Sequence, residues 1–252
     1  MYRLYIILLA FCVTSCDSEN AQPCFKTAGD ATVREYDVNV FNKITVSGDM
    51  QLVLKQGDVQ HIVLKSGANL INEVNLSVID EVLIASYNDG CNLVRDYGDT
   101  QLVVTVPRLT LIRNASSYDV VGDGELTFPR LRLESNILDA DTAVYYNNSG
   151  FDLTIKNEEI DISANGKARF KLRGTTSLLN VEFADKTARL EAEELPAERV
   201  EVFHRSSNKV IVNPQSSLSA IITGPGDIIS VNRPPDVDVD ERYTGKLIFM
   251  NN

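Results

Sequence analysis

Short segments in which apolar and polar residues alternate recur through most of the chain, and this recurrence constrains the fold more than any other feature. In the second half, similar segments begin at intervals of 18 to 26 residues, at Leu109, Leu131, Leu153, Leu179, Val200 and Leu218. A unit of about 20 residues cannot bury its own apolar side, whereas stacked units bury one continuous column. The repetition therefore predicts an all-β solenoid, a parallel β-helix of degenerate repeats.

An antiparallel β-sandwich is the alternative, because it shows a similar density of short strands. The first half alternates with a period of two as well, in runs such as Ile44-Thr45-Val46 and Gln51-Leu52-Val53-Leu54, and it has no apolar stripe at helical spacing. Near the other terminus we expect Pro234-Pro235 to mark the end of the stack. Residues 245–249 are predicted to form a last strand that covers this end.

The N-terminus predicts export. Arg3 precedes an apolar run from Leu4 to Val13, which is far shorter than the ~20 residues that a membrane span requires. The segment Val13-Thr14-Ser15-Cys16 resembles a lipobox, in which cleavage before the cysteine is followed by its lipidation. The acyl chains on Cys16 would then anchor the protein stably in a membrane. An ordinary secreted protein with a cysteine near its cleavage site is the alternative.

This reading divides the chain into three parts. We expect a lipoprotein signal peptide over residues 1–15, a lipidated tether over residues 16–31 and the β-helix domain over residues 32–252. The expected location is the cell envelope, as an outer-membrane lipoprotein, and either leaflet of the membrane can hold the lipid, so that exposure at the surface is one of two alternatives. The formal net charge of −11 repels phosphate backbones and therefore argues against a nucleic-acid partner.

Of the four cysteines, Cys12 leaves with the signal peptide and Cys16 carries the lipid, so that Cys24 and Cys91 remain. In an oxidising envelope a remaining pair commonly forms a disulfide. We therefore expect a disulfide between Cys24 and Cys91. Two free buried thiols are the alternative.

The sequence resembles the head domain of the auto-transporter adhesin family, the head GIN domain, from about residue 36 to residue 245. The resemblance is carried by Phe41-Asn42-Lys43-Ile44-Thr45-Val46, Gly67-Ala68-Asn69-Leu70-Ile71, Cys91-Asn92-Leu93-Val94-Arg95-Asp96-Tyr97, Val106-Pro107 and Gly224-Pro225-Gly226-Asp227-Ile228. It implies a right-handed parallel β-helix, similar in shape to pectin-lyase-like folds but without their catalytic residues, and a role in adhesion. The tips depart from the Gly-Ser-Gly turns of similar proteins, as in Asn114-Ala115-Ser116-Ser117.

Residues suited to catalysis are few. The two histidines, His61 and His204, are predicted to be surface or strand-edge residues, and no nucleophile elbow, phosphate loop or zinc-spaced Cys/His set is present. We therefore expect no catalytic site, no cofactor and no metal. Carboxylate pairs that cleave glycosides are invisible to this reasoning, because it does not give distances in space.

Four weaker features each have an ordinary structural explanation beside a functional one. The alternating acidic run Asp236–Glu241 is either a solvated edge strand or a weak Ca²⁺ site. The alternating Lys167, Arg169, Lys171 and Arg173 form either a solvated face or a surface for an anionic glycan. Tyr145-Tyr146 either packs or stacks on sugar rings. Asp141-Thr142-Ala143 matches a short O-glycosylation motif at Thr142.

Together these features favour a non-catalytic binding or adhesion module at the cell surface, with a glycan or protein as its ligand. A carbohydrate-active β-helix enzyme is one alternative. A structural envelope protein that associates with copies of itself through exposed strand edges is another.

Overall fold

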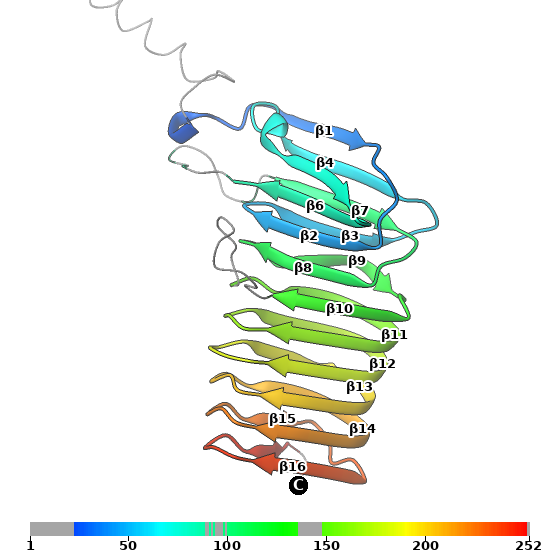
Figure 1. Cartoon of the computed structure of the whole chain (residues 1–252), viewed down its shortest axis with the longest axis vertical. Helices are drawn as coiled ribbons and strands as arrows, with labels where there is room; N and C mark the ends of the chain where they lie inside the picture. Colours follow the sequence, from blue (N-terminus) through cyan, green and yellow to red (C-terminus); the bar gives the residue numbers. More distant parts are fainter. Residues whose placement is uncertain are drawn as a thin grey trace, which may run out of the picture.

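The computed structural model describes residues 23–88, 91, 93, 98, 100–135 and 148–250. These residues form 17 strands, all in one mixed sheet that curls round on itself, and two short 3₁₀ helices, η1 (Pro23–Phe25) and η2 (Ile71–Glu73). The predicted all-β class is therefore confirmed. Figure 1 shows successive turns of the chain stacked along one long axis.

Parallel pairing dominates the C-terminal half of the stack. From β11 (Phe151–Ala164) onward, the partner residues of each strand and the strand that follows it in the stack lie 17 to 21 positions apart, as in Phe151 with Phe170 and Leu218 with Val237. The long strands bend between two walls of the stack, so that each contributes to both. The long strands are β11, β12 (Arg169–Phe183), β13 (Arg189–His204) and β14 (Val210–Ile222). The shorter β15 (Ile228–Ser230), β16 (Asp236–Glu241) and β17 (Leu247–Phe249) each lie in one wall.

We call the two walls A and B. Wall A continues from the second halves of β11–β14 to β16 at the C-terminal end of the stack, and wall B from their first halves to β15 and β17. Towards the N-terminal end, wall A contains β10 (Arg130–Ser135), β8 (Leu111–Ser116), β2 (Lys43–Gly48), β6 (Val82–Tyr87) and β5 (Asn75–Ile79). Wall B contains β9 (Val120–Leu126), β3 (Gln51–Gln56), β7 (Gln101–Val106), β4 (His61–Gly67) and β1 (Ala31–Tyr36).

The N-terminal end departs from a purely parallel arrangement. Strand β2 lies between β6 and β8. The strands that follow β2 in sequence therefore first extend the sheet towards the N-terminal end of the stack, and those from β8 onward extend it towards the C-terminal end. Strands β1, β4 and β5 pair in antiparallel fashion, β1 with β4, β4 with β7 and β5 with β6. The expectation of parallel pairing throughout is therefore wrong here. The antiparallel strands cover backbone groups that a parallel stack would leave unpaired at its first coil.

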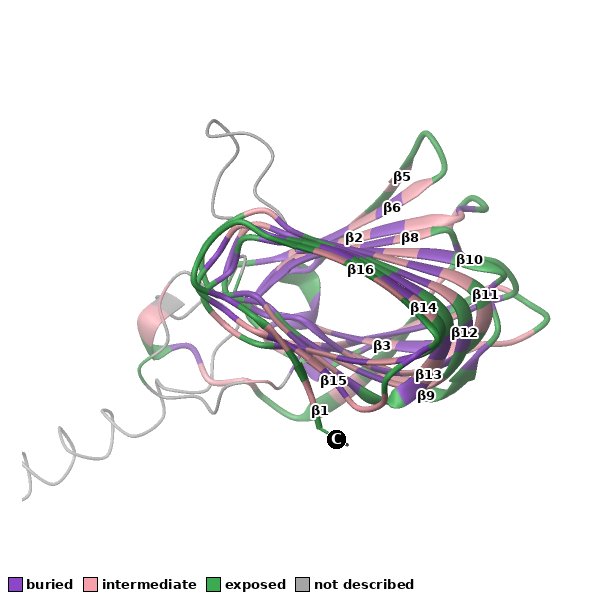
Figure 2. Ribbon diagram, turned by 90° about the horizontal axis from the view of Figure 1, so that it is seen from below, coloured by how far each residue is buried: buried purple, intermediate pink, exposed green. Residues whose placement is uncertain are grey.

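Side chains that point between the walls form the core. One column on wall A runs through Leu83, Ile44, Ile112, Leu133, Ile162 and Val181, each no more than 2% exposed. Burying an aliphatic side chain of this size stabilises the fold by about 1.5–3 kcal/mol. Figure 2, viewed along the stack, shows buried residues in the strands of both walls. The shared inner column that the alternation predicts is therefore present.

Two expectations about the repeats need correction. Leu131 pairs with Ile160 on wall A, whereas Leu153 belongs to wall B and pairs with Leu172, so the predicted series is out of phase at Leu153. The alternation is the same on both walls and cannot distinguish them. Pro234-Pro235 also does not end the stack, because β16 follows and pairs with β14, and β17 then extends wall B.

Candidate functional site

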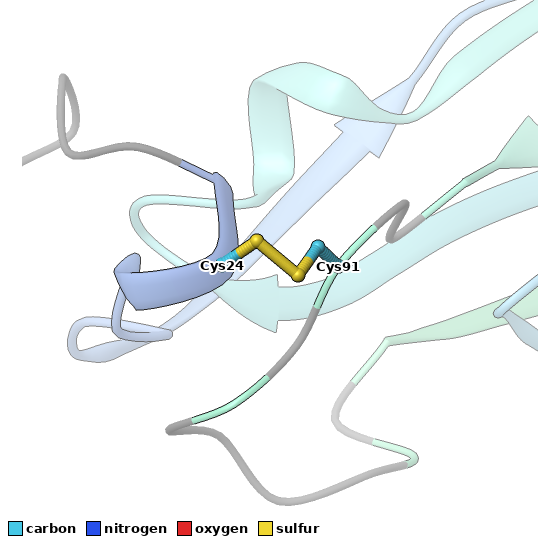
Figure 3. The surroundings of a disulfide bond; sticks show 2 residues. All are labelled: Cys24 and Cys91. Atoms are coloured by element: carbon cyan, nitrogen blue, oxygen red, sulfur yellow. A yellow bond between two sulfur atoms is a disulfide. The ribbon is translucent and has the colours of Figure 1, made fainter.

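The predicted lipidation site and its surroundings lie outside the described residues, as Cys16 belongs to the segment 1–22. The described part begins at η1, where Cys24 is joined to Cys91 by a disulfide (Figure 3). The backbone N–H of Leu93 also donates a hydrogen bond to the carbonyl of Cys24, at 3.1 Å. The N-terminal segment is thus attached to the end of the stack near β6. Among the described residues, no helix is long and apolar enough to cross a bilayer.

The two histidines lie in opposite environments. His61 is exposed at the start of β4, with its Nε2 3.5 Å from a carboxylate oxygen of Glu35. His204 is completely buried, so its prediction as a surface or edge residue is wrong. It occupies an inward position of β13, between Phe183 of β12 and Ile222 of β14.

Burial lowers the pKa of His204, although backbone groups of Asn208 and Gly226 and the charge of Asp227 favour protonation. Neither ring nitrogen makes a hydrogen bond of good geometry. The ring is therefore a neutral part of the core at neutral pH, without access to a substrate.

Two members of the basic row, Arg169 and Arg173 of β12, are paired with acidic residues of the neighbouring coils. Arg169 donates two hydrogen bonds to Glu191, which also accepts one from Arg189 at 2.7 Å. Arg173 lies 2.7 Å from Asp152. The hydrogen bond from Arg169, followed by that from Arg189, lowers the pKa of Glu191. Because these charges compensate each other within the sheet, Arg169 and Arg173 leave little net attraction for an anionic glycan.

The acidic run forms β16, the edge strand of wall A, with Asp236, Asp238 and Asp240 exposed. Arg242 lies 2.7 Å from Asp240, and Lys246 lies 2.8 Å from Glu241. The part of the chain that the structure describes holds no group of three or more His, Cys, Asp or Glu residues placed to bind a metal. The remaining candidates, Tyr145-Tyr146 and Thr142, lie outside the described residues.

Large exposed hydrophobic side chains instead mark the two ends of the stack. The described residues between 100 and 202 contain none of them. One group lies in the N-terminal coils and comprises Phe25, Val33, Val40, Val59, Ile79 and Leu93. The other lies in the last coils and comprises Phe203, Ile221, Tyr243, Ile248 and Met250.

We call the last coil, which comprises β16 and β17 with the exposed Tyr243, Ile248 and Met250, the C-terminal face. Phe203 and Ile221 are neighbours in register on the outside of wall A, and Ile248 and Met250 are exposed on or beside β17 at the end of wall B. Arg233 stacks over the Phe249 ring, 4.7 Å from its centroid. The inward Val239 and Leu247 are only partly buried, because no described strand packs over them on the side away from β14 and β15. This face combines apolar area with charged groups of both signs.

These residues belong to no recognisable motif, although the alternation contains one signal for two of them. Phe203 and Ile221 stand out of phase with the inward positions of their strands, Val202 and Ile222, so the alternation itself places them outside. An apolar residue at an outward position is exposed, and it therefore indicates a contact surface and not a part of the core.

Comparisons with known proteins identify relatives of the whole domain. The family model described as "Putative auto-transporter adhesin, head GIN domain" matches residues 40–234. A crystal structure titled a putative adhesin from Bacteroides fragilis has a TM-score of 0.74 at 18% identity, covering 89% of this chain and 99% of that chain. No curated protein matches.

Two structures from Parabacteroides distasonis are similar as well. One is titled a putative adhesin, with a TM-score of 0.60 at 15% identity, covering 88% of this chain and 99% of the other. The second is titled a putative lipid binding protein, with a TM-score of 0.56 at 14% identity, covering 88% of this chain and 98% of the other. At these identities the likeness concerns the fold.

Proposed function

Because the chain belongs to the family of head GIN domains of auto-transporter adhesins, we propose that it is a lipid-anchored, non-catalytic binding protein that presents its C-terminal face to a partner outside the cell. The observation that carries this proposal is the placement of exposed hydrophobic side chains at the ends of the stack and not along the described part of its middle. Exposed apolar area that is bordered by charges is typical of surfaces that bind other molecules.

We propose that the stack is a right-handed parallel β-helix, an architecture that suits this role. The offsets of 17 to 21 residues between parallel partners fit one coil per repeat. Parallel strands in one sheet are joined by right-handed connections in nearly all proteins. A β-helix is a stiff rod, and it would hold the C-terminal face at a fixed distance from the anchored end.

The anchor is the second part of the proposal. Cleavage before Cys16 would leave seven residues between the lipid and Pro23 of η1. An extended chain spans about 3.3–3.6 Å per residue, so this tether would reach about 25 Å. The N-terminal end of the stack would then lie near the membrane, and β16 and β17 would face away from it. We place the protein in the outer membrane, exposed at the cell surface.

A protein or a glycan is the kind of ligand that suits this face. Tyr243, Ile248 and Met250 supply flexible and aromatic apolar contacts, and Arg233, Arg242 and Lys246 supply charged hydrogen-bond donors. The net charge of −11 disfavours nucleic acid. The family's adhesin description supports binding without turnover.

Cells that display the full chain provide the test of the binding role. Glycan and extracellular-protein arrays are probed with such cells, and with cells that carry Tyr243→Ser, Ile248→Ser and Met250→Ser together. We expect the triple variant to lose at least tenfold of the bound signal, whereas Val59→Ser, at an exposed position of the N-terminal coils, leaves it unchanged. If wild-type cells bind to neither array, or if the triple variant binds as well as the wild type, the proposed role of this face is rejected.

The anchor is tested separately. Cys16→Ala is expected to abolish acyl labelling and to release the protein from the membrane fraction, and protease treatment of intact cells should degrade the wild-type protein. Unchanged membrane retention of Cys16→Ala would reject lipidation, and full resistance to protease would reject surface exposure.

A further inference from the structure

A hollow lies on the opposite end of the stack, beside β1. It has a volume of about 370 Å³, within the usual range of small-ligand sites. The lining includes Ala28, Gly29 and Ala31 on one side and Gly67 at the end of β4 on the other. Because these residues have small or no side chains, they leave the space unfilled, and the larger side chains of Val33 and Lys65 border it. Figure 1 places β1 and β4 together at this end.

The strand that borders the hollow has an open edge. Within the described residues β1 pairs only with β4, so the hydrogen-bonding groups of its other edge have no strand partner. Of its two charged side chains, Arg34 donates to Asn72 and the exposed Glu35 lies near His61. Val33 is 63% exposed. The edge strand β16, by contrast, carries three exposed aspartates, which is a common protection against pairing.

Lys65 supplies the charge of the hollow. It is the one ionisable side chain among the residues that line the hollow, and it lies directly opposite Val33 in the register of β1 and β4. The described residues provide no ion-pair partner for its ammonium group. A cation at the wall of a small apolar hollow, next to an unpaired strand edge, matches the requirements of an extended peptide that carries a carboxylate.

We propose that the hollow is a peptide-binding site. An extended segment of a partner protein adds to the free edge of β1, places a small apolar side chain between Val33 and the glycines, and sets a carboxylate against Lys65. Backbone pairing supplies affinity, and the hollow and Lys65 supply specificity. This site is separate from the C-terminal face, and its test does not depend on that face.

The probe is a panel of eight-residue peptides rich in valine and threonine that end in Ala, Val, Ile or Phe, each with a free C-terminal carboxylate and as the matching amide. Binding to the full chain is measured by calorimetry. We expect at least one free acid to bind, and its amide to bind about tenfold more weakly, because a charged hydrogen bond is lost. Lys65→Gln should weaken the acid by the same factor and bind acid and amide equally.

Two further variants complete the experiment. Val33→Glu places a carboxylate opposite Lys65 and should exclude the acid, and the exposed Lys209→Gln on the same wall should change nothing. Circular dichroism confirms that each variant is folded. Absence of binding across the panel up to about 1 mM, or an acid-to-amide ratio that survives Lys65→Gln, would overturn the proposal.

Discussion

His204 packs edge-on against Phe183, with their ring centroids 6.3 Å apart and their planes inclined by 60°. The contact continues an aromatic series, since Phe151 stacks on Phe170 at 5.3 Å and Phe170 lies 5.8 Å from Phe183. An imidazole thus takes the place of a fourth apolar ring. Because its nitrogens have no partner of good geometry, it contributes a buried polar group that the fold tolerates only in the neutral form.

This position makes stability sensitive to mild acid. The pKa of His204 is lower in the folded protein than its ordinary value of 6.5. The unfolded chain therefore binds more protons between these two values, so the free energy of unfolding is constant above about pH 6.5 and declines as the pH falls below it. His204→Phe should remove this slope and stabilise the protein by about 1–3 kcal/mol at pH 5. Urea denaturation from pH 7.5 to 5 measures it.

The exposed His61 provides the control. His61→Gln should retain the wild-type dependence on pH. If His204→Phe keeps the full acid-dependent slope, the titration belongs to another group and the role given to burial is wrong.

Glu191 predicts a second dependence on pH, in a lower range. Its carboxylate accepts hydrogen bonds from Arg169 and Arg189, and these lower its pKa below the ordinary 4.5. The stabilisation is therefore complete above about pH 4.5 and is lost as the pH falls through the lowered value. Glu191→Gln should reduce the free energy of unfolding by about 1 kcal/mol at pH 7, because the arginines are partly exposed.

The difference between Glu191→Gln and the wild type should shrink towards pH 3 and in 1 M NaCl, where the carboxylate is protonated or screened. Glu193→Gln, at an exposed position of the same strand, should have no measurable effect. An equal loss for both substitutions would mean that the arginine pairing adds nothing.

The disulfide between Cys24 and Cys91 closes a loop of 67 residues that contains the antiparallel end of the stack. In the chain-entropy model its removal destabilises the fold by about 4 kcal/mol. The double variant Cys24→Ser, Cys91→Ser should therefore unfold at lower denaturant concentration. Since each coil contacts only its neighbours, the loss should be local. Hydrogen exchange should increase in β1 and β4 and remain unchanged in β13 and β14; a uniform increase would contradict this.

The sequence predicts the inward residues well, because alternation reports which side of a strand faces the core. It identifies Ile44 and Leu52 as inward, and both are fully buried. The same alternation places His204 inward, because it follows the inward Val200 and Val202 at a spacing of two residues. The surface prediction for His204 failed because polarity was given more weight than position in the strand.

Alternation does not report which wall a strand joins or in what order the strands lie. Leu153 was placed in the wrong series for this reason, and nothing local in Lys43–Gly48 indicates that this strand lies between β6 and β8. That order depends on contacts between residues far apart in sequence. The open edge of β1 and the C-terminal face depend on it as well, since both arise where the stack ends.

Two glycines with similar backbone angles provide a test of what sets the spacing of the coils. Gly174 has φ +108° and Gly124 has φ +102°, a region that other residues adopt only with strain. A Cβ on Gly174 would lie 1.9 Å from the carbonyl oxygen of Ile155 on the adjacent coil, whereas a Cβ on Gly124 would meet nothing within 4 Å. Gly124→Ala should therefore lower the free energy of unfolding only by the backbone strain, about 1–3 kcal/mol.

Gly174→Ala should destabilise the protein by clearly more than Gly124→Ala, because it must also push β12 away from β11 and break backbone hydrogen bonds between them. Guanidinium denaturation of the two single variants under identical conditions gives the comparison. If the two losses are equal, the backbone at Gly174 relaxes without separating the strands. The close approach of Ile155 and Gly174 would then not determine the distance between these coils.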